Sequence, residues 1–370
     1  MWDTATGKAV VHIRGADPAD RNRMFATAAL SPDGKLAAGV IYDAFKSGSQ
    51  VLHVWDAVTG RELHRSEAPK AGSGLTFAPD GKRLAVRIGG EVVLVEAASG
   101  ARTQLPGAAG DGGPLVFSPD GKRLATAGSD GRVRTWNVER REAGPDGPVA
   151  GRNCTAAGLS PEWDLAAFAG GDRFVRVLSA ADGKERAAFG KLQQAAGAAE
   201  FSPDGALLAV GDAHLHLYDV AAGREVLRLE SLVGYPSGLR FSPDGRSLAV
   251  STTATETYVF DLAPVDPPAR FDPAGFDETY AALAGDDASA AYRAVWSLAA
   301  GGDAAVARIR AAAAAPVPAG ADAGLRRRRV VRALEMIAGA EAAALLESLA
   351  DAEPAARAAV QRLRRRPAGP

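Results

Sequence analysis

The sequence predicts a mainly β protein, a six-bladed β-propeller, followed by a small all-α domain. A turn of the type Ser-Pro-Asp-Gly recurs six times, and the prolines of these copies, at positions 32, 79, 119, 161, 203 and 243, lie 47, 40, 42, 42 and 40 residues apart. A period of about 40 to 45 residues is typical of a four-stranded propeller blade. After residue 275 the alternation of apolar and polar residues gives way to helical spacing, which predicts the second domain.

The best-preserved copy of the repeat spans residues 115–137. Both of its halves alternate apolar and polar residues, which is the period of a half-buried strand. The turn Ser118-Pro119-Asp120-Gly121 joins the first two strands, because proline presets φ at the second turn position and glycine is free to adopt a positive φ. Asp130-Gly131 then turns the chain into a third strand that ends at Trp136.

Each copy continues in the same way after its turn. A second apolar strand, such as 83–86 or 207–210, precedes a third strand that ends in an aromatic or aliphatic residue followed by a polar one. Those endings are Trp55-Asp56, Val95-Glu96, Trp136-Asn137, Leu178-Ser179, Tyr218-Asp219 and Phe260-Asp261. A Gly-Lys or Gly-Arg step often opens a fourth, more polar strand such as 225–229, which suits the outer edge of a blade, where the strand meets water.

The turn, the Trp-Asp ending and the Gly-Lys or Gly-Arg hairpin resemble WD-repeat (WD40) β-propellers of the bacterial style, over about residues 1–262. Members of that family often carry a Gly-His pair before the first strand and an Asp before the third, which join a Ser or Thr and the Trp in a buried hydrogen-bond network. Asp130 keeps the second feature in the third copy, whereas no copy keeps the Gly-His pair. We therefore expect the blades to stack through their apolar strands rather than through that network.

The two ends of the repeat region complement each other. Residues 1–3 match the end of a third strand and residues 7–13 a fourth strand, while the sixth copy stops after its third strand at Asp261, with Pro264 close behind. We expect residues 7–13 to pair antiparallel with residues 255–261 and complete a ring of six blades. The alternative is an incomplete seven-bladed ring that lacks an upstream blade.

The sequence divides into a propeller at residues 1–262, a proline-rich linker at 263–275 and an α-helical domain at 276–370. Helical spacing in the last part predicts helices over 276–284, 287–300, 303–313, 325–338, 341–350 and 354–366. The pattern of residues 325–365 is similar to HEAT-type helical repeats. Because one such repeat cannot bury its own apolar face, we expect it to pack on the preceding helices or on the propeller.

Composition narrows the classes of function. Of the 370 residues 47% are hydrophobic, which is enough for a large core, and 43 Lys and Arg balance 44 Asp and Glu, so no global field favours nucleic acid or an anionic membrane. The single cysteine, Cys154, excludes an internal disulfide and a cysteine-based zinc cluster. Without an apolar run of about 18 residues or a recognisable signal peptide, we expect a cytoplasmic protein with no membrane partner.

We predict no catalytic, cofactor or metal site. No segment matches a nucleophile elbow or a phosphate-binding loop. His214 and His216 share one face of a predicted strand, but their spacing to Asp212 and Asp219 does not place either carboxylate as a further ligand, and zinc needs about three or four. The arginine clusters at 326–329 and 364–366 lack interleaved aromatic residues, so we interpret them as solvated helix faces and expect no nucleic-acid partner.

The predicted function is that of a non-enzymatic scaffold. The loops that join one blade to the next, and the second strand to the third, gather on one face of a propeller. Residues of the aromatic and arginine-rich kind found at interface hot spots occur on these loops at Arg23, Met24, Phe25, Tyr42, Phe45, Arg173 and Tyr235. We expect this loop face to bind a protein or peptide, with the helical domain as a second contact or lid. The alternative is a propeller enzyme that resembles the lactonase or sugar-oxidising type, with a metal in the central channel.

Overall fold

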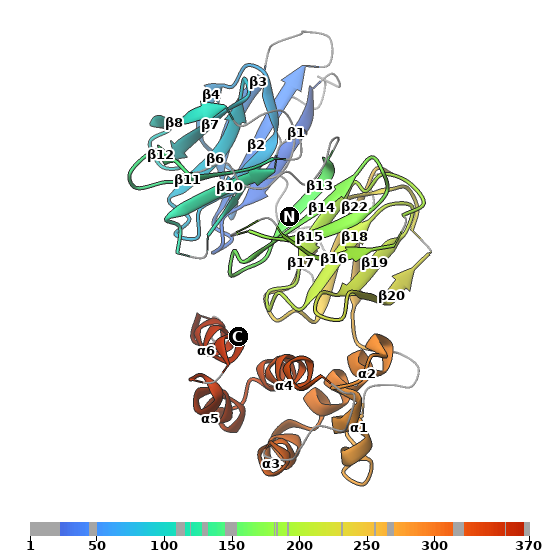
Figure 1. Cartoon of the computed structure of the whole chain (residues 1–370). Helices are drawn as coiled ribbons and strands as arrows, with labels where there is room; N and C mark the ends of the chain where they lie inside the picture. The colour runs from blue at the N-terminus through green and yellow to red at the C-terminus, as the bar shows by residue number, and fades with distance from the viewer. Residues whose placement is uncertain are drawn as a thin grey trace. The chain divides into compact units, whose positions relative to one another are not determined.

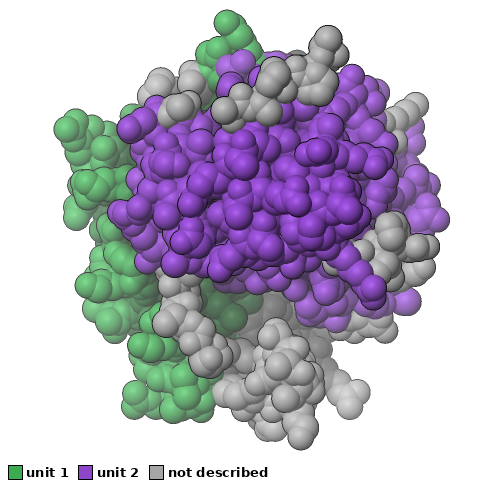
Figure 2. Space-filling model, turned by 90° about the horizontal axis from the view of Figure 1, so that it is seen from below, with its two compact units in different colours: residues 1–157, 179–184 green, residues 158–178, 185–370 purple. Residues whose placement is uncertain are grey.

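The computed structural model confirms a mainly β six-bladed propeller followed by a helical region (Figure 1). The structure describes residues 23–43, 50–108, 115–118, 120–127, 132–144, 154–180, 182, 184–190, 192–230, 232–254, 257–264, 270–313, 322–351 and 353–365. The chain divides into two compact units, coloured separately in Figure 2: unit 1 comprises residues 1–157 and 179–184, and unit 2 comprises residues 158–178 and 185–370. Blades one to three lie in unit 1, blades five and six lie in unit 2 with the described helices, and the boundary passes through blade four.

Each blade is an antiparallel sheet whose strands follow one another in chain order. In unit 1 the blades are β1 (Arg23–Leu30), β2 (Leu36–Asp43), β3 (Gln50–Asp56) and β4 (Glu62–Glu67); β5 (Ala71–Phe77), β6 (Arg83–Ile88), β7 (Glu91–Glu96) and β8 (Arg102–Ala108); and β9 (Leu115–Phe117), β10 (Arg123–Ala127), β11 (Val133–Asn137) and β12 (Glu142–Ala143). Blade four comprises β13 (Cys154–Leu159), β14 (Leu165–Gly170), β15 (Val175–Ser179) and β16 (Glu185–Phe189). Unit 2 continues with β17 (Ala198–Phe201), β18 (Leu207–Gly211), β19 (Leu215–Asp219) and β20 (Arg224–Leu229), and with β21 (Pro236–Phe241), β22 (Ser247–Thr252) and β23 (Thr257–Asp261).

The recurrent turn is held together by its own serine and aspartate. In blade three Ser118 Oγ donates to Asp120 Oδ1 (2.6 Å) and accepts from the Arg123 amide (2.9 Å), while Asp120 Oδ1 accepts from the Lys122 amide (3.0 Å). Gly121 takes a φ of 70°, in the left-handed region that glycine adopts without steric cost. The same bonds recur around Ser31, Ser202 and Ser242, so the motif is an autonomous turn that fixes the first hairpin of blades one, three, five and six.

Blade four keeps this turn with different residues. Trp163 stands where the other copies have glycine and adopts a φ of 60°, which is strained for a bulky side chain. Ser160 Oγ donates to Asp164 Oδ1 (2.6 Å) and accepts from the Leu165 amide (2.9 Å), so an aspartate one position beyond the tryptophan replaces the usual one. The buried indole of Trp163 accounts for the tolerance of this strain, because burial of its large apolar area stabilises the fold.

Alternate residues of the strands form the cores between neighbouring blades. In unit 1 one cluster joins blades one and two through residues such as Val40, Leu52 and Leu84, and another joins blades two and three around Leu105 and Trp136. Trp136 Nε1 donates to the Pro106 carbonyl (2.8 Å), which satisfies the one polar atom of this buried ring.

The helical region consists of α1 (Phe276–Ala282), α2 (Ala288–Ala300), α3 (Gly302–Ala312), α4 (Ala323–Ile337), α5 (Ala340–Leu349) and α6 (Pro354–Arg365). Asp287 caps α2, with its side chain accepting from the Ala290 amide (2.9 Å). The apolar faces of the helices share one core cluster with blades five and six, in which Leu217 and Leu248 occur together with Trp296 and Leu334. The helices therefore pack on the propeller, with α2 next to β20 (Figure 1).

Polar anchors from α4 reinforce this packing. Arg329 Nε and Nη2 donate to Asp219 Oδ2 (3.1 and 3.0 Å), and its Nη1 donates to the carbonyls of Leu283 and Gly285. One turn further along the helix, Arg332 Nε lies 3.2 Å from Asp204 Oδ2. These two aspartates belong to the Tyr-Asp ending and to the recurrent turn of blade five, so the helix binds residues that the repeat itself supplies.

The interpretation of residues 326–329 as a solvated cluster is wrong for two of its four members. Arg326 and Arg329 are buried, with 8% and 5% of their surface exposed, whereas Arg327 and Arg328 are exposed. Arg326 lies over the ring of Tyr280, 5.1 Å from its centroid, and Arg329 holds Asp219. Helical periodicity explains the split, because residues three apart share the face that packs inward.

Blade six has three strands within the described residues. Residues 7–13, predicted to complete this blade, lie outside the described part of the chain, and so do residues 265–269 of the predicted linker. The domain boundaries at 262 and 276 thus remain a prediction. The shared core shows that the helices and the last two blades are not separate hydrophobic cores.

Candidate functional site

In unit 2, loops of blades four, five and six come together at one end of their strands. The Arg173 carbonyl, after β14, accepts from the Leu192 amide (2.7 Å), and the Gly197 amide donates to the Gly211 carbonyl (2.8 Å). Pro236, at the start of blade six, lies so close to Gly211 that a Cβ there would come within 2.3 Å of the proline ring. We call this surface, formed by residues 171–174, 192–197, 212–214 and 232–235, the unit 2 loop face.

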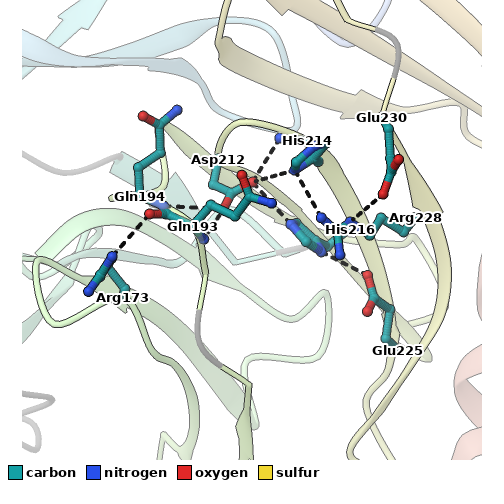
Figure 3. A network of polar contacts seen from close by, with 9 residues as sticks. All are labelled: Arg173, Gln193, Gln194, Asp212, His214, His216, Glu225, Arg228 and Glu230. Atoms are coloured by element: carbon teal, nitrogen blue, oxygen red, sulfur yellow. Dashed lines mark hydrogen bonds and ion pairs between the residues drawn. The ribbon is translucent and has the colours of Figure 1, made fainter.

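Asp212 is the centre of a polar network on this face (Figure 3). Its side chain follows β18 and is almost fully buried, with 1% of the residue exposed. Oδ2 accepts from the Gln193 amide (2.7 Å), and Oδ1 accepts from the His214 amide (2.7 Å) and from His216 Nε2 (3.0 Å). Burial by itself raises the pKa of the Asp212 carboxyl, but these donors outweigh it and hold the pKa below its usual range. Asp212 is thus a fixed, buried carboxylate.

His216 lies in β19 between two carboxylates. Its Nδ1 is 2.7 Å from Glu225 Oε1 on β20, and its Nε2 faces Asp212. The ring is buried and stacks on Tyr218, with centroids 5.9 Å apart and planes 11° from parallel. Two strands and an aromatic neighbour therefore fix the orientation of this imidazole.

His214 is the more accessible histidine of the network. It lies two residues before His216 in the hairpin that leads into β19, and its ring meets that of His216 edge-on with centroids 6.1 Å apart. Its Nδ1 is 3.9 Å from Asp212 Oδ1 and 3.3 Å from Arg228 Nη2, while Arg228 Nε lies 3.3 Å from Glu230 (Figure 3). The Asp212 carboxylate and the two imidazoles thus converge, with donor atoms that all lie within 4.8 Å of one another.

The sequence prediction missed Asp212 as a member of this group. The signal that could have found it is the family pattern of an Asp before the third strand, which Asp212 satisfies in blade five. In place of the family's histidine it accepts backbone amides of the preceding loop, together with His216 from its own blade. Asp219, the other carboxylate considered, points away to Arg329.

Two predicted interface residues lie on the unit 2 loop face. Arg173 is exposed and donates from Nη1 to the Gln193 carbonyl (3.2 Å), which ties it to the Asp212 network (Figure 3). Tyr235 lies just before β21, where its amide donates to Thr253 Oγ1 (3.0 Å) and its carbonyl accepts from the Thr253 amide (2.9 Å). These two hydrogen bonds involve only the backbone of Tyr235, and 56% of the residue is exposed.

The other predicted residues belong to blade one, in unit 1. Arg23, Met24 and Phe25 begin β1, and Met24 pairs in register with Tyr42 near the end of β2. Met24 lies seven residues before Ser31 of its turn, as Tyr235 lies seven residues before Ser242 in blade six. Tyr42 is half-buried, and Phe45 lies outside the described residues.

A hollow in unit 2 lies between the helical region and the turns of blades four and five, with a volume of about 620 Å³. Charged residues line it, but several are paired with one another: Arg329 with Asp219, Arg332 with Asp204, and Arg362 with Glu335 and Glu162. Because these ion pairs hold the helices on the blades, we assign this hollow to the docking of the helices rather than to a ligand.

The family model described as WD domain, G-beta repeat matches residues 115–137, which form the best-preserved copy of the repeat, in blade three. No curated protein matches the chain. Across the described residues, no helix combines the length and the apolar character needed to cross a membrane.

Proposed function

We propose that this chain, a WD-repeat propeller of six blades with a C-terminal helical region, is a non-enzymatic scaffold that binds a protein or peptide through its loop face. The observation that carries the proposal is a group of exposed apolar side chains on the unit 2 loop face. Tyr235 is 56%, Val233 58% and Phe174 38% exposed, and Arg173 adjoins Phe174. Aromatic residues and arginine are enriched where proteins bind one another.

The loop backbone supports this proposal because it holds the exposed side chains in place. Two hydrogen bonds with Thr253 fix the Tyr235 turn, and the Val233 amide lies 3.3 Å from the Tyr258 hydroxyl. A preorganised surface loses less conformational entropy on binding. The non-enzymatic reading is supported by His216, since both of its ring nitrogens face carboxylates and neither is open to take a proton from a substrate.

The test is site-specific photo-crosslinking in cell extract with the full chain. A photoreactive phenylalanine analogue at position 235 is expected to form a discrete adduct with one partner, and Tyr235→Ala is expected to weaken capture of that partner by about tenfold or more, the scale of an interface hot spot. The matched control is the same analogue at Val259, which is 58% exposed on β23 and outside the loop face. Identical adduct patterns at the two positions, or turnover of a substrate by the purified chain, would overturn the proposal.

A further inference from the structure

We propose that Asp212, His214 and His216 form a binding site for a divalent transition-metal ion of the zinc class. The inference is independent of the proposed scaffold function, because it rests on the donor atoms of blade five alone. Imidazole nitrogen and carboxylate oxygen are donors that zinc accepts, and three protein ligands with one open position are a common zinc arrangement.

The spacing of the donor atoms fits such an ion. Ligand atoms bound about 2.0–2.2 Å from a tetrahedral zinc lie about 3.3–3.6 Å from one another. Asp212 Oδ1 lies 3.0 Å from His216 Nε2 and 3.9 Å from His214 Nδ1, distances that bracket this range. An ion between these atoms would replace the hydrogen bond from His216 to Asp212 and would draw the two imidazole nitrogens, which lie within 4.8 Å of each other, closer together.

The surroundings of the donors also fit. A metal-bound histidine nearly always donates its other ring N–H to a carboxylate, a carbonyl or water, and Glu225 Oε1 lies 2.7 Å from His216 Nδ1. Backbone amides of Gln193 and His214 hold the Asp212 carboxylate. Asp212 and His216 are buried while His214 is half-buried, so an ion can reach the donors from the side of His214.

Blade one contains one part of this arrangement, the histidine–glutamate pair, but not the other two donors of the proposed metal site. His53 Nδ1 lies 2.9 Å from Glu62 Oε2, the same cross-strand pair as His216 and Glu225. Val51 stands at the position that His214 occupies in blade five. A histidine–glutamate pair is therefore a structural feature of the repeat, and the second imidazole with Asp212 is the addition that points to a metal.

Arg228 is the residue that opposes binding. Its Nη2 lies 3.3 Å from His214 Nδ1, the atom offered to the ion, and its positive charge repels a cation. Because Arg228 is exposed and has Glu230 as a second partner, it can swing away. Removal of this arginine is expected to strengthen zinc binding.

The experiment is calorimetric titration of Zn²⁺ into the chelator-treated full chain, with Co²⁺ absorption as an independent readout of coordination. We expect one ion per chain, and d–d bands of the intensity of a tetrahedral site. His214→Ala is expected to weaken binding by more than the loss of a supporting group, which costs about 10–100-fold. Arg228→Gln is expected to tighten binding severalfold, and unfolding curves of both variants check that the fold is kept.

The matched control uses the two blades. Glu225→Gln is expected to weaken zinc binding about 10–100-fold, whereas Glu62→Gln, the same change in blade one, should leave it unchanged. Absence of stoichiometric binding, or binding that survives His214→Ala, would show that the triad is a purely structural hydrogen-bond network. Equal effects of Glu225→Gln and Glu62→Gln would also overturn the proposal.

Discussion

Blade one and blade five place the same side chains at the same repeat positions and use them differently. In blade one Asp33 and Asp56 bind only groups of their own turns among the contacts described, through Ser31 and the amides of Val58 and Thr59, and Asp33 faces the exposed Lys35. Their counterparts in blade five, Asp204 and Asp219, make the equivalent turn bonds and also bind arginines of α4.

The comparison distinguishes the contacts that the repeat motif forms by itself from the contacts that depend on neighbouring elements. The hairpin after the third strand places a carboxylate at the same point of blades one and five, with one oxygen occupied by backbone amides. The second oxygen of Asp219 is available to any element packed nearby, and α4 supplies Arg329 there. The same residue is thus part of a local turn in one blade and a tertiary anchor in the other.

The largest effect on stability is expected when the aspartates at equivalent positions of blades five and one are replaced. Asp219→Ala leaves the buried Arg329 guanidinium without its carboxylate, and loss of one partner of a buried ion pair costs about 3–5 kcal/mol. Asp56→Ala removes the same turn bonds but no ion pair with a helix, so its loss should be clearly smaller. Urea unfolding of the two variants measures the difference. Equal losses would mean that Arg329 contributes no net stability.

The contacts that distinguish blade five from blade one are the part of the structure that could not be predicted from the sequence. The turns, strands and helices that the structure describes could be predicted because period, turn residues and helical spacing are local signals. The docking of α4 on blade five could not, because Arg329 and Asp219 are 110 residues apart and nothing in the spacing of either segment identifies its partner. For Asp212 the family pattern of an Asp before the third strand was the available signal, but its hydrogen-bond partners could not be predicted, because they depend on how the preceding loop returns to the blade.

The comparison of blades one and five can also be tested through the pH dependence of stability, because Glu200 is a titratable residue of blade five. It occupies the position of Ala29 in blade one, and burial raises the pKa of its carboxyl to about 7, while the charge of Arg240 offsets this little because that side chain is 81% exposed. The folded pKa is above the unfolded value of 4.5, so the stability from this group is present below pH 4.5 and is lost as pH rises to 7.

Glu200→Gln removes this titration and should flatten the stability profile between these pH values, by an amount on the order of 3 kcal/mol. Urea midpoints measured at pH 4.5, 6 and 8 provide the comparison. A variant whose profile parallels that of the wild type would show that Glu200 is solvated in the folded protein.

At acid pH the expected effect is smaller and concerns Asp204. Burial alone raises the pKa of this carboxyl, but Arg332, Ser202 and the Ala206 amide together hold it below the ordinary value of 3.8. The contribution to stability is therefore complete above pH 3.8 and is lost as pH falls through the lower folded value. Arg332→Gln should make the acid limb of the stability profile less steep, whereas Lys35→Gln beside the exposed Asp33 should hardly change it. Thermal melts from pH 2 to 5 would reveal the two slopes, and identical slopes would contradict the role given to Arg332.

The smallest loss of stability is expected for the turn glycines, and it should be the same in blades one and five. Gly34 and Gly205 adopt φ values of 70° and 71°, and a Cβ at Gly34 would meet no atom within 4 Å while one at Gly205 would make an ordinary contact with Pro161, 3.6 Å away. Gly34→Ala and Gly205→Ala should therefore each cost about 1 kcal/mol, the strain of a left-handed alanine. Because this cost arises in the turn itself, the covering of blade five by the helices should not change it. A much larger loss for Gly205→Ala in urea unfolding would mean that the helices also constrain the backbone of the turn, and that their influence on blade five extends beyond its two aspartates.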